Sequence, residues 1–204
     1  MAGCKPFTLE QQKAIEADLL EHANGLRNAA WFNLGCNSGF RISELMAVKR
    51  GQLIAFNGEF NRWVTIQGKR RIKRRVMVNS GAEAMLNPWL DEMECKGMIE
   101  AERYVFATQT DKHLDPKYCL ELLQASARRV GMYWEKYELG THSMRKTFAQ
   151  RFYDKAMELS ANGEKVDPLR ATSEALGHTN INNTLRYLQG IRSDIDAIIE
   201  SIAS

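Results

Sequence analysis

The sequence predicts an α+β domain that is mainly helical and carries a small three-stranded antiparallel sheet. Apolar residues recur at helical spacing over most of the chain, and one central stretch changes to short β-rich runs. The 204 residues are enough for one domain with a sizeable core. With 44% hydrophobic and 26% charged residues, the composition is that of a globular domain, and no apolar run approaches the roughly 18 residues of a membrane span.

Capping signals locate the predicted helices. Thr8 and Gln11 fit a capping box, so a first helix is expected to begin there and to end near Gly25. Asp115 followed by Pro116 is typical of a helix N-terminus. Further helices are expected at residues 26–35, 42–48, 82–96, 116–130, 143–160, 170–176 and 184–188, and in the tail from residue 193.

The predicted sheet consists of residues 52–56, 62–67 and 74–79. Asn57-Gly58 is a strong hairpin signal between the first two strands, and Gly68 lies between the second and third. Seven basic residues and no acidic ones lie between Asn61 and Ser80, although the net charge of the whole chain is only +3. This basic block predicts a polyanionic partner.

The four cysteines are far apart, and the N-terminus has no apolar signal core. We therefore expect a cytoplasmic protein, in a bacterial nucleoid or a phage-infected cell, with no membrane contact. There is no Cys-x-x-Cys motif and no cluster of carboxylates, so we expect no metal and no cofactor.

Three short segments contain the residue types of phosphate chemistry. They are Ser38–Leu45, which has the pattern Gly-x-Arg-x-Ser-Glu-Leu, His142–Arg145, and Leu176–His178 with Tyr187 nine residues after the histidine. Each has an ordinary structural explanation by itself, such as a helix surface pair, a solvated helix face or a helix end. These separate explanations do not account for the occurrence of all three segments in this order, with a basic hairpin between the first two.

The ordered set resembles the catalytic domain of the tyrosine recombinases, the phage integrase family, from about Thr8 to Ile191. The resemblance implies the fold of that domain. It also implies a site-specific DNA recombinase or integrase that breaks and rejoins DNA through a 3′-phosphotyrosyl intermediate. A type IB topoisomerase-like relaxing enzyme and a DNA-binding regulator without turnover remain the alternatives.

By the resemblance, the catalytic set is Arg41, Lys69, His142, Arg145, His178 and Tyr187. The two arginines would clamp the phosphate, because planar guanidiniums present paired donors to an anion. Tyr187 would be the nucleophile, and its ordinary pKa of about 10 means that it needs a base, the role implied for His142. Tyr153 is the next tyrosine to consider.

The remaining roles are supporting ones. The resemblance implies that His178 donates a hydrogen bond to the scissile phosphate and that Glu44 braces the first arginine. Lys69 is the implied general acid because it follows Gly68 at the turn, although Lys73 is an alternative. The expected DNA-binding residues are Arg70, Arg71, Lys73 and Arg74, for which a solvated basic surface is the ordinary explanation.

The sequence departs from the family pattern at its ends and in one loop. Little chain precedes the catalytic domain, so we expect a minimal recombinase or an excised domain. Surplus residues around 157–167 predict a surface insertion. Residues 1–192 are expected to form the catalytic domain, and residues 193–204 an amphipathic tail that docks in trans, with packing on its own domain as the alternative. The expected partners are double-stranded DNA, further copies in a tetrameric synapse and an accessory DNA-bending protein.

Overall fold

The computed structural model describes residues 4–67, 73–132 and 138–188. The chain divides into two compact units, residues 1–148 and residues 149–204. The long helix α7 (Thr141–Ala161) begins in the first unit and continues into the second. In the described part of the chain, no helix is both long enough and apolar enough to cross a membrane.

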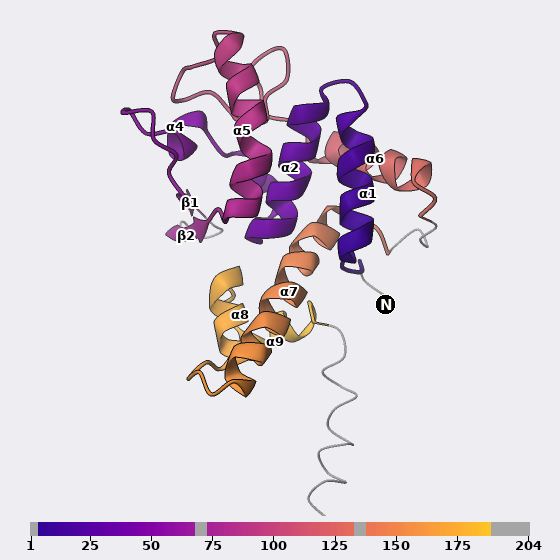
Figure 1. Cartoon of the computed structure of the whole chain (residues 1–204), viewed down its shortest axis with the longest axis vertical. Coiled ribbons are helices and arrows are strands. Elements are labelled where there is room, and N and C mark those ends of the chain that lie inside the picture. Colours follow the sequence, from indigo (N-terminus) through magenta and orange to yellow (C-terminus); the bar gives the residue numbers. More distant parts are fainter. Residues whose placement is uncertain (1–3, 68–72, 133–137, 189–204) are drawn as a thin grey trace, which may run out of the picture. The chain divides into compact units, whose positions relative to one another are not determined.

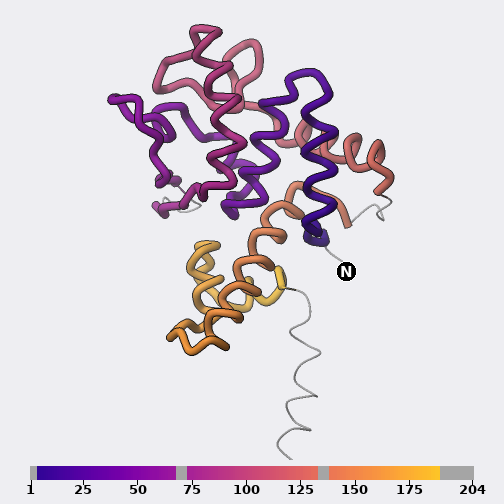
Figure 2. Tube along the Cα trace, viewed as in Figure 1, coloured from indigo at the N-terminus to yellow at the C-terminus, as the bar shows by residue number. Residues whose placement is uncertain are grey.

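The first unit is a group of helices around one core. Its elements are α1 (Leu9–Leu20), α2 (Gly25–Ser38), α3 (Ile42–Met46), α4 (Arg50–Leu53), β1 (Trp63–Gln67), β2 (Lys73–Met77), α5 (Ser80–Cys95), α6 (Pro116–Arg129) and the start of α7. Helix α2 lies between α1 and α5 (Figures 1 and 2). Trp31 and Phe32 of α2 are fully buried, and burial stabilises each such side chain by about 1.5–3 kcal/mol. The core predicted from the sequence is therefore present.

The helix boundaries confirm most of the capping predictions. Thr8 and Gln11 form the predicted capping box of α1, and Asp115 caps α6. Gly25, however, is the first residue of α2 rather than the end of α1, which stops at Leu20. A Cβ atom at Gly25 would lie 2.2 Å from the Leu20 carbonyl oxygen, so the glycine is explained by a close backbone approach.

The sheet has two strands in the described residues, and the predicted three-stranded meander is wrong in its first strand. Strands β1 and β2 pair antiparallel, with Trp63 opposite Met77. Residues 50–53 form the short helix α4, and Ile54 makes only an isolated bridge. The Gln52 side chain donates to the Thr65 carbonyl oxygen at 2.8 Å, so a side chain instead of a third strand uses this acceptor of β1.

The second unit contains the rest of α7, α8 (Pro168–Leu176) and α9 (Ile181–Leu185). Helices α8 and α9 contact each other. The expected insertion at 157–167 is only partly a loop, because α7 continues to Ala161 before the exposed turn at Gly163, whose φ is +92°. The helix predicted at 184–188 is observed as α9, Ile181–Leu185.

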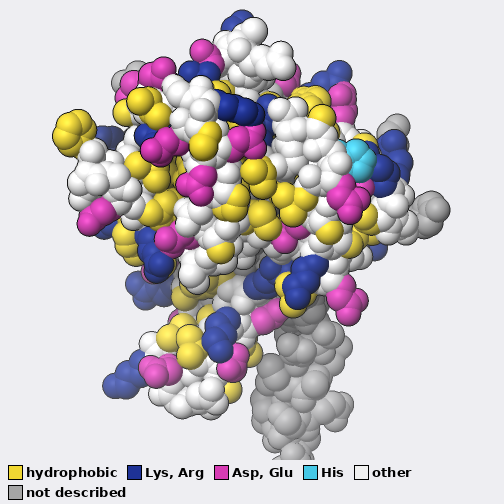
Figure 3. All heavy atoms as spheres, turned by 45° about the horizontal axis from the view of Figure 1, so that its top comes forward, with side chains coloured by type: hydrophobic (Ala, Val, Ile, Leu, Met, Phe, Trp, Pro, Cys, Tyr) yellow, Lys and Arg dark blue, Asp and Glu magenta, His cyan; other side chains and the backbone are white. Residues whose placement is uncertain are grey.

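Basic and acidic side chains are mixed on the face shown in Figure 3, with small apolar areas between them. This face brings forward the upper end of the first unit as drawn in Figure 1. No broad area of one sign covers this face.

Candidate active site

Arg41 and Glu44 meet where α3 begins. Gly39 ends α2 in the left-handed conformation, with φ +66°, and the chain turns there so that Arg41 becomes the N-cap residue of α3. The carboxylate of Glu44 accepts from the Arg41 backbone N–H and from Arg41 Nη1, both at 2.8 Å. A helix start thus fixes both the backbone and the guanidinium of Arg41.

A second arginine shares the same carboxylate. Arg74 Nη2 donates to Glu44 Oε2 at 2.8 Å, and the Glu44 side chain is only 7% exposed. Burial raises the pKa of Glu44, but the Arg41 backbone N–H and the charge and hydrogen bond of Arg74 outweigh it, so the pKa is lowered. Glu44 is therefore a buried anion between two arginines.

Arg145 lies in the first part of α7 and is buried, with 1% of its surface exposed. Its Nη1 donates to the Gly39 carbonyl oxygen, and Arg74 Nη2 approaches the same oxygen at 3.4 Å. The turn after α2 thus brings the first predicted arginine, its glutamate and the second predicted arginine into one network. Burial of a guanidinium is costly unless acceptors surround it, which gives the Gly39 carbonyl a structural importance that the sequence motifs do not indicate.

His142 lies beside this network and is exposed. Partial desolvation of its ring and the positive charges of Arg145, Arg41 and Lys146 lower its pKa. The imidazole is therefore neutral at pH 7, the form that can accept a proton.

His178 and Tyr187 meet in the second unit. Gly177 ends α8 in the left-handed conformation, and the short helix α9 then returns the chain. As a result, the rings of His178 and Tyr187 lie 5.2 Å apart between centroids, tilted by 54°. The nine-residue spacing in the sequence is thus the number of residues that the chain needs to pass through α9 and bring Tyr187 back to His178.

Thr184 is a site residue that the sequence motifs did not predict. It is fully buried, and its Oγ1 lies 2.9 Å from His178 Nδ1. Its carbonyl oxygen also accepts from the Tyr187 backbone N–H at 2.8 Å. A threonine three residues before the nucleophile position is a weak sequence signal, because threonine is common in such turns.

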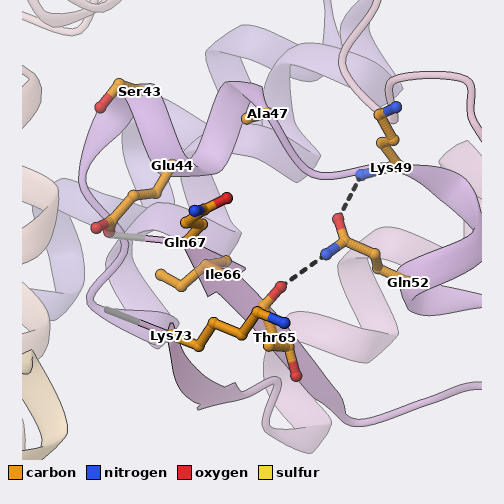
Figure 4. A pocket seen from close by; sticks show the side chains of 9 residues that line it. All are labelled: Ser43, Glu44, Ala47, Lys49, Gln52, Thr65, Ile66, Gln67 and Lys73. Atoms are coloured by element: carbon orange, nitrogen blue, oxygen red, sulfur yellow. Dashed lines mark hydrogen bonds between the residues drawn. The ribbon is translucent and has the colours of Figure 1, made fainter. Parts of the chain in front are cut away.

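A groove of about 590 Å³ in the first unit is lined by Lys73, one of the two predicted lysines (Figure 4). Glu44 of α3 and Lys73 of β2 both line it, and Gln52 connects the Lys49 backbone N–H to the Thr65 carbonyl oxygen across it. Lys73 is exposed at the first position of β2. The groove therefore places one of the two candidate lysines on the same surface as Glu44.

Several predicted residues stay untested in position. Lys69, Arg70 and Arg71 lie outside the described residues, as does the tail from residue 193. Within residues 4–67, 73–132 and 138–188, no group of three His, Cys, Asp or Glu side chains could hold a metal ion.

Residues 7–191 match the phage integrase family, and the chain belongs to that family. Among curated relatives, tyrosine recombinase XerC of Pseudomonas syringae pv. syringae (strain B728a) is 29% identical over 190 residues, which cover 89% of this chain and 55% of that protein. The chain spans about half the length of the XerC relatives it matches. Probable integrase/recombinase YoeC of Bacillus subtilis (strain 168) is 24% identical over 187 residues, covering 92% of this chain and 89% of that protein.

Solved structures confirm the fold. XerH site-specific recombinase, bound to its palindromic difH substrate in a post-cleavage complex, superposes with a TM-score of 0.69 at 20% identity, covering 98% of this chain and 53% of that one. XerA recombinase gives a TM-score of 0.69 at 16% identity, covering 99% and 66%. The fold is thus that of the tyrosine recombinase catalytic domain, as the sequence predicted.

Proposed function

We propose that this chain is the catalytic domain of a site-specific DNA recombinase that forms a 3′-phosphotyrosyl intermediate. The contact between His178 and Tyr187 is the observation that carries the proposal, because it joins the nucleophile to a phosphate-binding group. The names of the XerC and YoeC relatives support the same activity.

Arg41 and Arg145 would hold the scissile phosphate. Both are guanidiniums anchored on the turn after α2, so their donors are in place before the substrate arrives. Preorganised donors of this kind are typically worth about 3–4 kcal/mol each in the transition state. Arg145 is almost completely buried in the free chain, so it is the more firmly positioned of the two arginines. Part of its donor set must become exposed when DNA binds.

In the proposed step, the Tyr187 phenol oxygen attacks phosphorus and the bond from phosphorus to the 5′ oxygen breaks. The phenol proton passes to His142, whose neutral form is favoured by its lowered pKa. His178 donates to a non-bridging oxygen, and its ring is held through Nδ1 by Thr184.

The departing 5′ oxygen requires a proton. Lys69 is the proposed donor, and Lys73 is the alternative whose position beside Glu44 is described. The phosphotyrosyl bond conserves the energy of the phosphodiester, so rejoining to a new 5′-hydroxyl needs no nucleotide cofactor. Neither step calls for a metal.

We further propose double-stranded DNA as the substrate and a tetrameric synapse as the working assembly, with an accessory DNA-bending protein. Residues 1–192 would be the catalytic unit, and residues 193–204 would dock on a neighbouring subunit, because their isoleucines recur at helical spacing. The site of action would be the bacterial cytoplasm, where the DNA lies. Lys73, together with Arg70 and Arg71, would supply basic charge toward the phosphates.

The test uses a pool of nicked duplexes with randomised arms, which trap a covalent protein–DNA adduct when the cleaved fragment diffuses away. Wild-type protein is expected to form an adduct that survives denaturation, and sequencing of the trapped DNA identifies the site. Paired sites on one plasmid should then recombine. Relaxation of any supercoiled plasmid without recombination would favour a topoisomerase, and binding without an adduct would favour a regulator.

A further inference from the structure

Arg74 is a charged residue on the inward face of the hairpin. Along β2 the side chains alternate, so that Lys73 and Arg75 are exposed while Val76 is buried. Arg74 has the same parity as Val76 and lies opposite Ile66, which is 7% exposed. A solvated basic surface would not place an arginine at this position.

The guanidinium of Arg74 reaches both parts of the arginine network. One nitrogen, Nη2, donates to Glu44 at 2.8 Å and approaches the Gly39 carbonyl oxygen at 3.4 Å. Glu44 also holds Arg41, and the Gly39 carbonyl also accepts from Arg145. Arg74 therefore shares the acceptor Glu44 with Arg41 and the Gly39 carbonyl oxygen with Arg145.

The same residue belongs to the strand that follows the lysine turn. Arg74 is next to Lys73 and pairs in register within the hairpin. Its side chain is 14% exposed, and its Nη2 is directed to Glu44 and the Gly39 carbonyl oxygen. Its contacts instead tie β2 to the start of α3.

We propose that Arg74 is a positioning residue that fixes Glu44, and through it Arg41, while anchoring strand β2, which begins at Lys73; the catalytic part of this inference rests on the proposed recombinase function. Arg74 thereby couples the position of Lys73 to the position of the phosphate clamp. The prediction from the sequence had placed Arg74 among the DNA-contacting residues, and the positioning role takes precedence over that one.

An arginine suits this role better than a lysine does. The two acceptors, Glu44 and Gly39, lie in directions that a planar guanidinium nitrogen serves with two fixed N–H bonds. Lysine would keep the charge beside Glu44 but would hold the acceptors less rigidly. Arg74→Lys should therefore retain more function than Arg74→Ala.

The first arm of the test needs no DNA. Carbon-detected NMR titration of Glu44 in the free protein should give a higher pKa in Arg74→Ala than in wild type, because the charge and hydrogen bond of Arg74 lower that pKa. Arg129→Ala is the matched control, since it also removes an arginine paired with a carboxylate, Asp18, at 2.7 Å. An unchanged pKa of Glu44 in Arg74→Ala would overturn the inference.

The second arm measures single-turnover cleavage of the trapped nicked duplex at saturating DNA. Arg74→Ala should slow cleavage by about tenfold to a hundredfold, because small misplacement of a positioned group has effects of this size. Arg74→Lys should fall between Arg74→Ala and wild type. Glu44→Gln should also slow cleavage, and adding Arg74→Ala to it should slow cleavage little further, because both changes act through the same contact.

The outcomes separate the inference from the proposed function. Weaker DNA binding with an unchanged saturated rate would overturn the inference and restore the direct phosphate contact. If wild-type protein forms no adduct, the proposed function fails, and the NMR arm still decides whether Arg74 positions Glu44. If Arg74→Ala does not fold, Arg74→Lys and Arg74→Gln carry both arms, and a wild-type cleavage rate in Arg74→Gln would overturn the inference.

Discussion

His178 lies with its ring centroid 5.2 Å from that of Tyr187, although the two residues are separated by a helix end and a further short helix. Two backbone features produce this contact: the left-handed Gly177 and the return of the chain through α9. Thr184 also holds the histidine, because its Oγ1 lies 2.9 Å from His178 Nδ1. The proposed nucleophile and its neighbouring histidine are thus organised within one compact unit.

Replacing Thr184 by Val should loosen His178. We expect cleavage at saturating DNA to fall by about fivefold, the size of effect that follows removal of one orienting hydrogen bond, which is worth about 1 kcal/mol. Thr172→Val is the matched control, because Thr172 is also buried but donates to the Pro168 carbonyl oxygen at 2.7 Å, outside the site. Equal cleavage rates in the two variants would contradict the role given to Thr184.

The pH dependence of cleavage should report His142. Its pKa is lowered by partial desolvation and by Arg145, Arg41 and Lys146, so the ring loses its proton at a pH below the ordinary value of about 6.5. A base acts when neutral, and the cleavage rate should therefore rise with pH in the acid range and level off before pH 7. Single-turnover rates between pH 5 and 8 measure this.

The control for this profile is His142→Gln, which cannot titrate. This variant should be slower at pH 7 and should lack the rise in rate. A rise of the same shape in His142→Gln would assign the titration to another group.

Salt dependence tests the basic hairpin. Neutralising Arg70 and Arg71 together should flatten the plot of log binding constant against log salt, by about 0.9 for each DNA phosphate that the variant no longer neutralises. Arg129→Gln is the control, because this residue is paired with Asp18 far along the sequence from the hairpin. An unchanged slope in the double variant would mean that these two arginines form a solvated surface.

Deleting residues 193–204 tests the tail. If the tail docks in trans, the deletion should weaken assembly of paired-site complexes more than binding to a single site, because only the former joins subunits. Gel-shift titration on single and paired sites compares the two. Equal assembly by the truncated and full chains would show that the tail packs on its own domain.

The fold could be predicted from the sequence because its elements depend on local signals, and the candidate site residues were proposed from signals of the same kind. The capping box at Thr8, the proline after Asp115 and the ordered motifs at Arg41, Arg145 and Tyr187 are all read within a few residues. The strand predicted at residues 52–56 is instead helix α4 and an isolated bridge at Ile54. Gln52 satisfies β1 through its side chain, which composition does not reveal.

Contacts between distant segments could not be predicted in the same way. The alternation of side chains along β2 could have shown that Arg74 lies on the same face as the buried Val76. Its acceptor Glu44, however, is 30 residues away in the sequence, and no local pattern indicates it. The Gly39 carbonyl that joins Arg145 to the turn has no side-chain signal at all. Such contacts follow from tertiary packing and not from a local pattern.

The most direct test of the central claim is to locate the covalent bond between protein and DNA. Wild-type adduct formed on the nicked duplex should give, after digestion and mass spectrometry, a nucleotide-modified peptide that contains Tyr187. Tyr187→Phe should bind DNA with nearly unchanged affinity and form no adduct, whereas Tyr153→Phe should still form one. An adduct in Tyr187→Phe, or a modification mapped to Tyr153, would contradict the proposed mechanism.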